Sequence, residues 1–356
     1  MKKTLVALAA LAVVSASAFA QSSVTLYGRI DASIGSQKQS NVNGTAADLD
    51  AGVQVRSGAH TGSRWGLRGS EDLGGGLRAI FQLEQGFNID TGAPSSTREF
   101  HRQAFVGLSG GFGTIEIGRQ YDTIDQMYAN YDAMGSSGFS ANGALSTFCS
   151  ATASAASAQT TGLGARGLGD CVVRQDNAIQ YTTPAMGGFG AKLMWAPGED
   201  KGVASAGRAT GGQVFYANGP IGVGAGYQSN KASGASTISN YMVGASYDFG
   251  VAKLYGAFEG GRNKNAAVNG KDNGAVIGVV APLGAFTLLA NYARENNKTA
   301  GAKFADSTGL GLMGQYALSK RTYTYAAYRN LEVDFSAAGR QTEKQRTYGV
   351  GVVHNF

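Results

Sequence analysis

The last twelve residues, "QRTYGVGVVHNF" at positions 345–356, decide the fold. Every second residue, counted back from the end, is bulky, and the residues between them are mostly small or polar. The bulky set is Tyr348, Val350, Val352, His354 and Phe356. A period of two predicts a β-strand. Most chains end in a loose polar tail. A chain that ends in a strand with an aromatic last residue therefore needs a partner strand, and its aromatic end needs an explanation.

The stretch "SSVTLYGRIDASIG" at 22–35 offers that partner. Its apolar face includes Val24, Leu26 and Ile34, and its polar face includes Arg29 and Asp31. A closed barrel has no free edge, so its last strand pairs with its first. The alternation alone fits a soluble sandwich as well as a membrane barrel, because only the direction of the apolar face differs.

The first twenty residues indicate export. A basic start, "MKK", precedes the apolar run "TLVALAALAVV" and the small-residue site Ala18-Phe19-Ala20. We expect residues 1–20 to be a cleaved signal peptide and residues 21–356 to be the mature chain. Loss of Lys2 and Lys3 lowers the formal charge from +6 to +4. A charge of +4 spread over 336 residues (356 minus 20) is no basic patch, so we expect no nucleic-acid partner.

The composition and the recurring turn signals favour a large all-β protein. Gly is abundant, with 54 residues, Pro is scarce, with 5, and Tyr and Phe total 32 (16 plus 16). Tight-turn signals recur at 73–77, 109–113, 186–190, 217–222, 247–251, 282–286 and 317–321. Seven turns join fourteen strands, and one strand at each end makes sixteen. The prediction is therefore a 16-stranded antiparallel transmembrane β-barrel in the outer membrane.

Longer polar stretches alternate with these turns and are predicted to be loops, among them 37–62 and 261–274. Aromatic residues near strand ends are predicted to form two girdles at the membrane interfaces. They are Tyr181, Phe215, Tyr216, Tyr247, Phe249, Phe286, Tyr316, Tyr323, Tyr325 and Phe356.

One interval between turns is about twice as long as the others. The turns near 111 and 188 are 77 residues apart, whereas the other spacings are 30–36. An insert of this length is usually functional or disordered. A sixteen-stranded barrel leaves an aqueous lumen, so we expect the third long loop, at about 121–174, to fold inward and narrow it.

Several arginines are predicted to face the lumen. Arg64 and Arg68 alternate with apolar residues, Arg29 lies on the polar face of the first strand, and Arg102 and Arg174 have similar surroundings. Basic side chains around a pore favour anions. The alternative is that these arginines simply pair with carboxylates, namely Asp31, Glu71, Glu84 or Glu99.

Cys149 and Cys171 lie within the long insert of an exported chain, which favours a disulfide between them. No ligand spacing surrounds them and the three histidines are scattered, so we expect no metal site. We also expect no cofactor, because no phosphate-binding glycine motif precedes a helix.

The chain resembles the trimeric general porins of Gram-negative outer membranes, in the branch typical of beta-proteobacteria. The resemblance rests on "SSVTLYGRIDASI", "SRWGLRGSEDLGGGLRAIFQLEQGF", "RQAFVGLSGGFGTIEIGRQYD", "DNAIQYTTPAMGGF" and the terminal "YGVGVVHNF". It implies a homotrimer in outer-membrane lipid, with the long loop as a constriction. Small hydrophilic solutes and inorganic ions would diffuse through it.

The resemblance also implies functional residues. The basic constriction cluster falls on Arg64, Arg102 and Arg174, with Arg29 and Arg68 nearby. The acidic side falls on the loop residues Asp122, Asp125 and Asp132. The terminal strand, with Tyr348, Val350, Val352 and Phe356 on one face, is similar to the signal that the outer-membrane barrel-assembly machinery reads. The sequence departs from the family in its longer, Ala/Ser/Gly-rich loop with two cysteines, which puts the narrowest radius in doubt.

Three other functions compete with a general diffusion pore. A barrel enzyme needs a nucleophile beside a histidine and an acidic orienter. Only His101, two residues after Glu99, is a plausible member, and no serine motif accompanies it. A substrate-specific channel would need a dedicated binding ladder. An adhesin or receptor would use the long external loops.

Overall fold

The computed structural model describes residues 22–42, 45–135, 137–142, 173–198, 208–231, 237–264 and 269–356. The predicted signal peptide, Cys149, Cys171 and the second half of the predicted constriction loop lie outside these residues.

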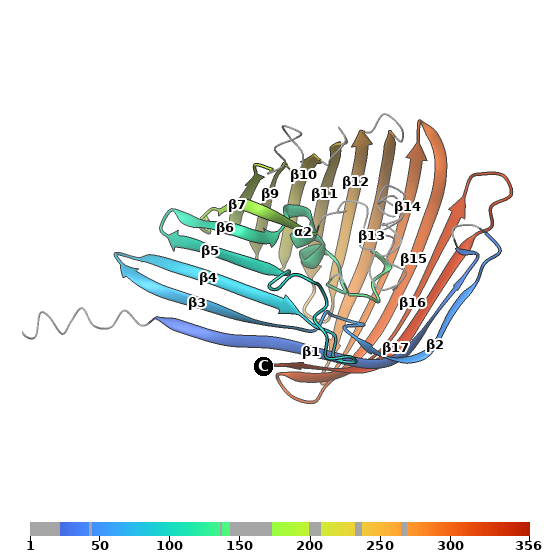
Figure 1. Cartoon of the computed structure of the whole chain (residues 1–356), viewed down its shortest axis with the longest axis horizontal. Helices are drawn as coiled ribbons and strands as arrows, with labels where there is room; N and C mark the ends of the chain where they lie inside the picture. Colours follow the sequence, from blue (N-terminus) through green and yellow to red (C-terminus); the bar gives the residue numbers. More distant parts are fainter. Residues whose placement is uncertain are drawn as a thin grey trace, which may run out of the picture.

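Within the described residues, seventeen strand segments form a single wall, and one α-helix lies inside it (Figure 1). The strands are β1 (Ser23–Ser40), β2 (Leu49–Ser57), β3 (Arg64–Gly74), β4 (Leu77–Gly86), β5 (Gln103–Gly110), β6 (Gly113–Tyr121), β7 (Arg174–Thr182), β8 (Phe189–Ala196), β9 (Ala209–Asn218), β10 (Ile221–Lys231), β11 (Thr237–Asp248), β12 (Lys253–Lys264), β13 (Gly270–Leu283), β14 (Phe286–Thr299), β15 (Ala302–Ala317), β16 (Thr322–Phe335) and β17 (Glu343–Asn355); the helix is α2 (Thr123–Tyr131).

The wall closes because the last strand pairs with the first, as predicted. Along β1 and β17, Arg29 to Ser40 lie opposite Asn355 to Lys344 in antiparallel register. The final residue takes part in this pairing. Phe356 and Gly28 exchange backbone hydrogen bonds of 3.0 and 3.1 Å. The sheet therefore has no free edge at the chain ends.

Seventeen segments fill sixteen barrel positions. The first half of β1 pairs with β3, and its second half pairs with β2. β2 and β3 thus share one position, interrupted by residues 58–63. The remaining neighbours pair in chain order, all antiparallel. This confirms the predicted closed 16-stranded antiparallel barrel.

The seven tight turns are confirmed, but the predicted loops at 37–62 and 261–274 are too long, because about half of the first stretch and most of the described residues of the second belong to strands. β2 occupies 49–57, β1 continues to residue 40, and β12 and β13 extend to 264 and from 270. Polar residues in these stretches occupy strands because backbone pairing with a neighbour satisfies their N–H and C=O groups. β2 also exposes Leu49, Val53 and Val55, so part of the first stretch has the alternation of a strand.

The apolar residues of the alternating pattern point outward. On β1, Val24, Leu26 and Ile34 are 66%, 58% and 55% exposed, whereas Asp31 and Ser33 on the other face are buried. On β17, the alternating residues Tyr348, Val350 and Val352 likewise point outward. This is the direction expected for a barrel in lipid with a polar lumen.

The aromatic girdles are only partly as predicted. Tyr247, Phe249, Phe286, Tyr316 and Phe356 are exposed, and Phe286 packs against Tyr316. Tyr325 was wrongly assigned to a girdle. It is buried on the inner face of β16 and donates a hydrogen bond to Asp31. Tyr323 shares that face, and Phe215 alternates with the outward Val214 and Tyr216. Strand-end position alone did not reveal which face a ring occupies.

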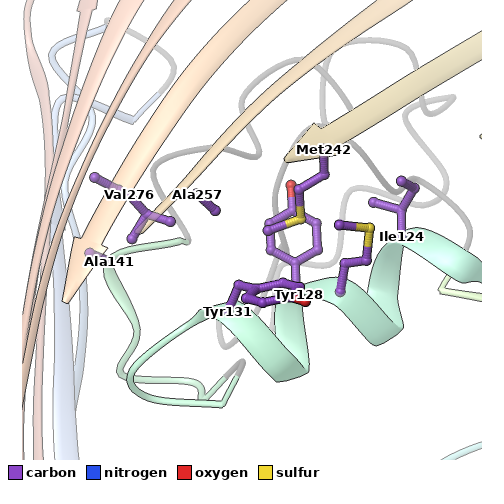
Figure 2. Close-up of a cluster of buried hydrophobic side chains, with 9 residues drawn as sticks. Ile124, Tyr128, Tyr131, Ala141, Met242, Ala257 and Val276 are labelled. Atoms are coloured by element: carbon purple, nitrogen blue, oxygen red, sulfur yellow. The ribbon is translucent and has the colours of Figure 1, made fainter. Parts of the chain in front are cut away.

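Helix α2 lies inside the barrel against β8–β12 (Figure 1). Its apolar residues Ile124, Met127, Tyr128 and Tyr131 follow helical spacing and are all buried. They form one cluster with Met242 of the wall, and Val276 and Ala257 belong to the same cluster beside Ala141 (Figure 2). Among the described helical residues, none forms a helix long and apolar enough to cross a membrane.

Glycine makes room for this helix in the wall. A Cβ at Gly224 would come within 2.5 Å of the Tyr131 hydroxyl, and one at Gly244 would collide with the Tyr131 ring. Only residues without a side chain let the helix approach the sheet this closely. The first part of the long insert is therefore seated in the lumen by the wall's own sequence.

Candidate functional site

Two arginine side chains converge on one tyrosine at the end of β6. The Tyr121 hydroxyl accepts hydrogen bonds from Nη2 of Arg102, at 2.6 Å, and from Nη2 of Arg174, at 2.7 Å. The guanidinium of Arg174 also lies over the Tyr121 ring, 4.3 Å from its centroid. A phenol oxygen can accept from two donors, and the ring face attracts a cation. Tyr121 therefore holds two positive charges side by side.

Glu84 on β4 is the carboxylate of this group. It is buried and accepts from Nε of Arg102 at 2.7 Å and from the Tyr27 hydroxyl at 3.0 Å. Nε of Arg64 lies 3.7 Å from Oε2 of Glu84, the oxygen that accepts from Tyr27. One carboxylate thus faces two arginines, so the pairing with Glu84 considered as the alternative is present.

The fold explains why these residues meet. Arg64 begins β3, Arg102 immediately precedes β5, and Arg174 begins β7. Tyr121 ends β6 and lies directly opposite Arg174 in register. Because neighbouring strands run antiparallel, these termini all lie at the same height of the wall. We call Arg29, Arg64, Arg102 and Arg174 the basic group.

Arg29 belongs to this group by register, since it lies directly opposite Arg64 on the adjacent strand. Its side chain donates to Asn355 at 2.6 Å and to Thr61 at 3.1 Å. Four arginines and Glu84 give a formal charge of +3 (four minus one). Arg68 shares the inner face but lies over the Tyr27 ring, 5.2 Å from its centroid. It is not brought to Tyr121.

The predicted loop carboxylates lie in and around α2. Asp122 caps the helix by accepting from the Asp125 backbone N–H at 2.8 Å, and it accepts from Gln228 of the wall at 3.0 Å. Asp125 interacts electrostatically with Arg174.

Asp132 ends the helix. It accepts from Asn291 of β14 at 2.7 Å and from Ser140 at 2.8 Å. Asp122 and Asp132 therefore anchor the two ends of α2 to the wall. The assignment of Asp122, Asp125 and Asp132 to the acidic side of a constriction stays a prediction.

A short segment that sequence reasoning missed holds the loop from the other side. His60, in the interruption between β2 and β3, contacts Ser137 through Nδ1 at 2.8 Å, and its carbonyl accepts from Gly138. Its ring packs against Tyr325, and its backbone N–H donates to Asp31. Burial, aided by the charge of Arg29, lowers the pKa of His60 to about 4. His60 is therefore neutral at neutral pH.

His101, the histidine considered for an enzyme, contacts Ser95 through Nε2 at 3.2 Å. Its Nδ1 is buried and has no hydrogen-bond partner in the part of the chain that the structure describes. A serine–histidine pair needs an acidic partner on that nitrogen to orient the ring. Within the described residues, this pair has no such partner.

The residues of the predicted assembly signal share one face. Tyr348, Val350 and Val352 on β17 and the terminal Phe356 all point outward, with 40–57% of each side chain exposed. The surface is thus available in an isolated chain. Its recognition by an assembly machinery stays a prediction.

Comparison with known proteins identifies a family. Residues 7–336 match the family model described as Gram-negative porin. The chain is 37% identical over 377 residues to outer membrane porin protein 32 of Delftia acidovorans and 33% identical over 411 residues to an outer membrane porin protein of Bordetella pertussis, with 100% of each chain covered in both cases.

A solved structure agrees. The anion-selective porin from Comamonas acidovorans has 30% sequence identity and a TM-score of 0.76, over 94% of this chain and 100% of that chain. OmpT of Vibrio cholerae in its trimer form, at 17% identity and a TM-score of 0.67 over 94% and 99%, shows the shared fold alone.

Proposed function

This chain belongs to the Gram-negative porin family, and on that premise we propose that it is an outer-membrane diffusion channel whose basic group makes it prefer anions. The observation that carries the proposal is the convergence of Arg102 and Arg174 on Tyr121, beside Arg64. The four guanidinium groups outnumber the carboxylates near them, because Glu84 contacts Arg102 and Arg64 while Asp31 and Asp125 interact electrostatically with Arg29 and Arg174. A low-dielectric wall strengthens the field of such charges. The anion selectivity named for the porin from Comamonas acidovorans supports this proposal.

The long insert, at about 121–174, narrows the lumen in this proposal. Its first part, residues 122–142 apart from residue 136, packs against the inner wall from β8 to β15. The basic group lies on β1–β7. A solute would then pass between α2 and the arginines, where an anion gains favourable contacts and a cation is repelled.

We test the proposal with the reversal potential of the purified protein in a planar bilayer under a KCl gradient. The wild type should reverse on the anion side, and Arg174→Ala should shift the potential toward zero. Arg340→Ala is the matched control, because Arg340 is exposed between β16 and β17 and lies over Phe335. A cation-side reversal of the wild type would refute the anion preference and leave the porin assignment intact.

Three copies are proposed to associate through the side of the barrel formed by β1–β7. On these strands the exposed large apolar side chains are all aliphatic, such as Val24, Val106 and Ile117. On β8–β17 they include aromatic rings such as Phe189, Tyr241 and Phe286. Rings anchor a barrel at the lipid interface, so a face whose strands carry only partly exposed rings, with Phe112 exposed in the β5–β6 turn, suits contact with another copy. Cross-linking of cysteines placed at Val106 tests this assembly.

The outward row on β17 is proposed to be the contact for the barrel-assembly machinery. It joins an aromatic terminal residue to Tyr348, Val350 and Val352 on one exposed face. Phe356→Ala should lower the amount of trimer in outer membranes while the protein still refolds in detergent. Unchanged membrane levels would contradict this role.

A further inference from the structure

Three buried carboxylates lie on the part of the wall that carries none of the basic group. Glu259 on β12, Asp272 on β13 and Glu295 on β14 are 2%, 3% and 0% exposed. The register brings the two glutamates together, because both lie opposite Gly274, one from each neighbouring strand. Gly274 has no side chain to separate them.

The next row of the same wall adds two amides. Asn240 of β11 and Asp272 flank Gly261, and Asn297 of β14 lies opposite Asp272. A Cβ at Gly261 would come within 2.7 Å of both Asp272 carboxylate oxygens and within 3.0 Å of Oδ1 of Asn240. The carboxylate and the amide oxygen therefore share the space that the missing side chain leaves.

The protein satisfies few of the oxygens of this group. Both carboxylate oxygens of Glu259, Oδ1 of Asp272 and Oδ1 of Asn240 are buried without a hydrogen-bond partner. The side chains of Glu295 and Asn297 interact only with each other, and the Gly261 backbone interacts with Asp272. The ion pairs recorded among the described residues include none of the three carboxylates. Buried polar groups are nearly always bonded, and buried charges need a counter-charge.

We propose that Glu259, Asp272, Glu295 and Asn240 form a binding site for a divalent cation with the ligand preferences of Ca²⁺. Ca²⁺ takes six to eight oxygen ligands from carboxylates, amide carbonyls and water in flexible geometry. Asn240 is the independent indication, because its neutral amide oxygen gains nothing from three carboxylates but is a ligand for a hard cation. Asn297 can supply a further amide oxygen.

The side chains must move to bind the ion. Among the residues that the structure describes, no three acidic, histidine or cysteine groups are already gathered as a metal site. The glutamates lie one row below Asp272, and rotation about their side-chain bonds would bring their oxygens toward the space at Gly261. Ca²⁺ would then join β11, β12, β13 and β14 on the inner side of the barrel.

The test is a calorimetric titration of CaCl₂ into the full-length protein, purified in detergent and stripped of metal with EGTA. The wild type should bind about one Ca²⁺ per chain and melt at a higher temperature with Ca²⁺ than with EGTA. The double variant Glu259→Gln, Glu295→Gln should lose at least about tenfold in affinity, since Ca²⁺ affinity follows the charge of the ligand set. Glu71→Gln with Asp72→Asn, on the exposed end of β3, is the matched control.

A second variant keeps every ligand side chain and fills only the space beside Gly261. Gly261→Ala should weaken Ca²⁺ binding as strongly as the double variant, and Asn240→Ala serves if Gly261→Ala does not fold. Arg102→Ala should bind Ca²⁺ like the wild type. The Ca²⁺ site and the anion preference can therefore be tested independently. Two results would overturn the proposal. One is equal affinity in the double variant and its control. The other is no effect of Ca²⁺ on binding heat or melting temperature, and stability that rises as pH falls would then show that protons neutralise the carboxylates.

Discussion

Arg29 on β1 and Arg64 on β3 lie directly opposite each other in antiparallel register, both on the inner face of the wall. Like charges in this position destabilise a sheet. The nearby groups offset part of the repulsion, since Arg29 donates to Asn355 and Thr61 and Arg64 lies near Glu84. A barrel that keeps such a pair beside Arg102 and Arg174 has concentrated positive charge on one stretch of its inner face.

Glu84→Gln should strengthen anion preference and weaken the fold. The formal charge of the group rises from +3 to +4, and Arg102 loses its 2.7 Å carboxylate contact. Removing one partner of a buried pair costs about 3 to 5 kcal/mol, and less here because Arg64 is partly exposed. Reversal potential and urea unfolding measure the two effects. Glu71→Gln, at the exposed end of β3, should change neither.

Tyr121→Phe should keep the anion preference and loosen the arginines. The ring still lies under Arg174, but two hydrogen bonds from charged donors are lost, each worth about 1.5–3 kcal/mol. We expect noisier single-channel currents and lower unfolding stability. Tyr181→Phe is the control, because that hydroxyl donates to the Phe112 carbonyl near a tight turn. Quiet, wild-type currents from Tyr121→Phe would argue against a positioning role.

Asn291→Ala should release the loop that follows α2. The Asn291 side chain donates to Asp132 and Ser140 and accepts from the Ala141 backbone N–H. Three bonds at about 1 kcal/mol each give a loss of about 3 kcal/mol. Limited proteolysis near residues 132–142 should become faster, and open-channel conductance should change. Asn218→Ala, on the exposed end of β9, is expected to behave as the wild type.

His60 should make stability depend on pH between about 4 and 6.5. Its pKa is about 4 in the folded barrel and 6.5 when unfolded, so the unfolded state binds the proton more tightly. Stability from this residue is complete above pH 6.5 and falls as pH drops toward 4, by about 3 kcal/mol in all. Unfolding free energies of the wild type and His60→Gln across this range measure the effect. Parallel curves for the two proteins would exclude it.

The local sequence pattern predicted the first and last strands, their outward faces and the number of strands. Alternation around Val24 and Val350 identified the first and last strands and their outward faces, and glycine-rich turns gave the strand count. β2 was missed although Leu49, Ala51, Val53 and Val55 recur at every second position, because the polar residues around them led the whole stretch to be interpreted as one loop. Tyr325 was misplaced because only register with β17 reveals its inward face.

The basic group was predictable as residue types and not as an arrangement. Arg64, Arg102 and Arg174 were recognisable from alternation and from the family resemblance. The shared hydroxyl of Tyr121 joins residues on β6 and β7 with the residue before β5. Such a contact depends on how three strand ends align in space. The support of the loop by His60 likewise needs an interrupted barrel position that no sequence signal marked.

The central claim is that the basic group sets ion preference, and a graded series tests it most directly. Reversal potentials under one KCl gradient should be compared for the wild type, Arg174→Ala, the double variant with Arg102→Ala and the triple variant with Arg64→Ala. We expect a stepwise loss of anion preference with each arginine removed. A triple variant that is folded, conducts and keeps the wild-type reversal potential would contradict it.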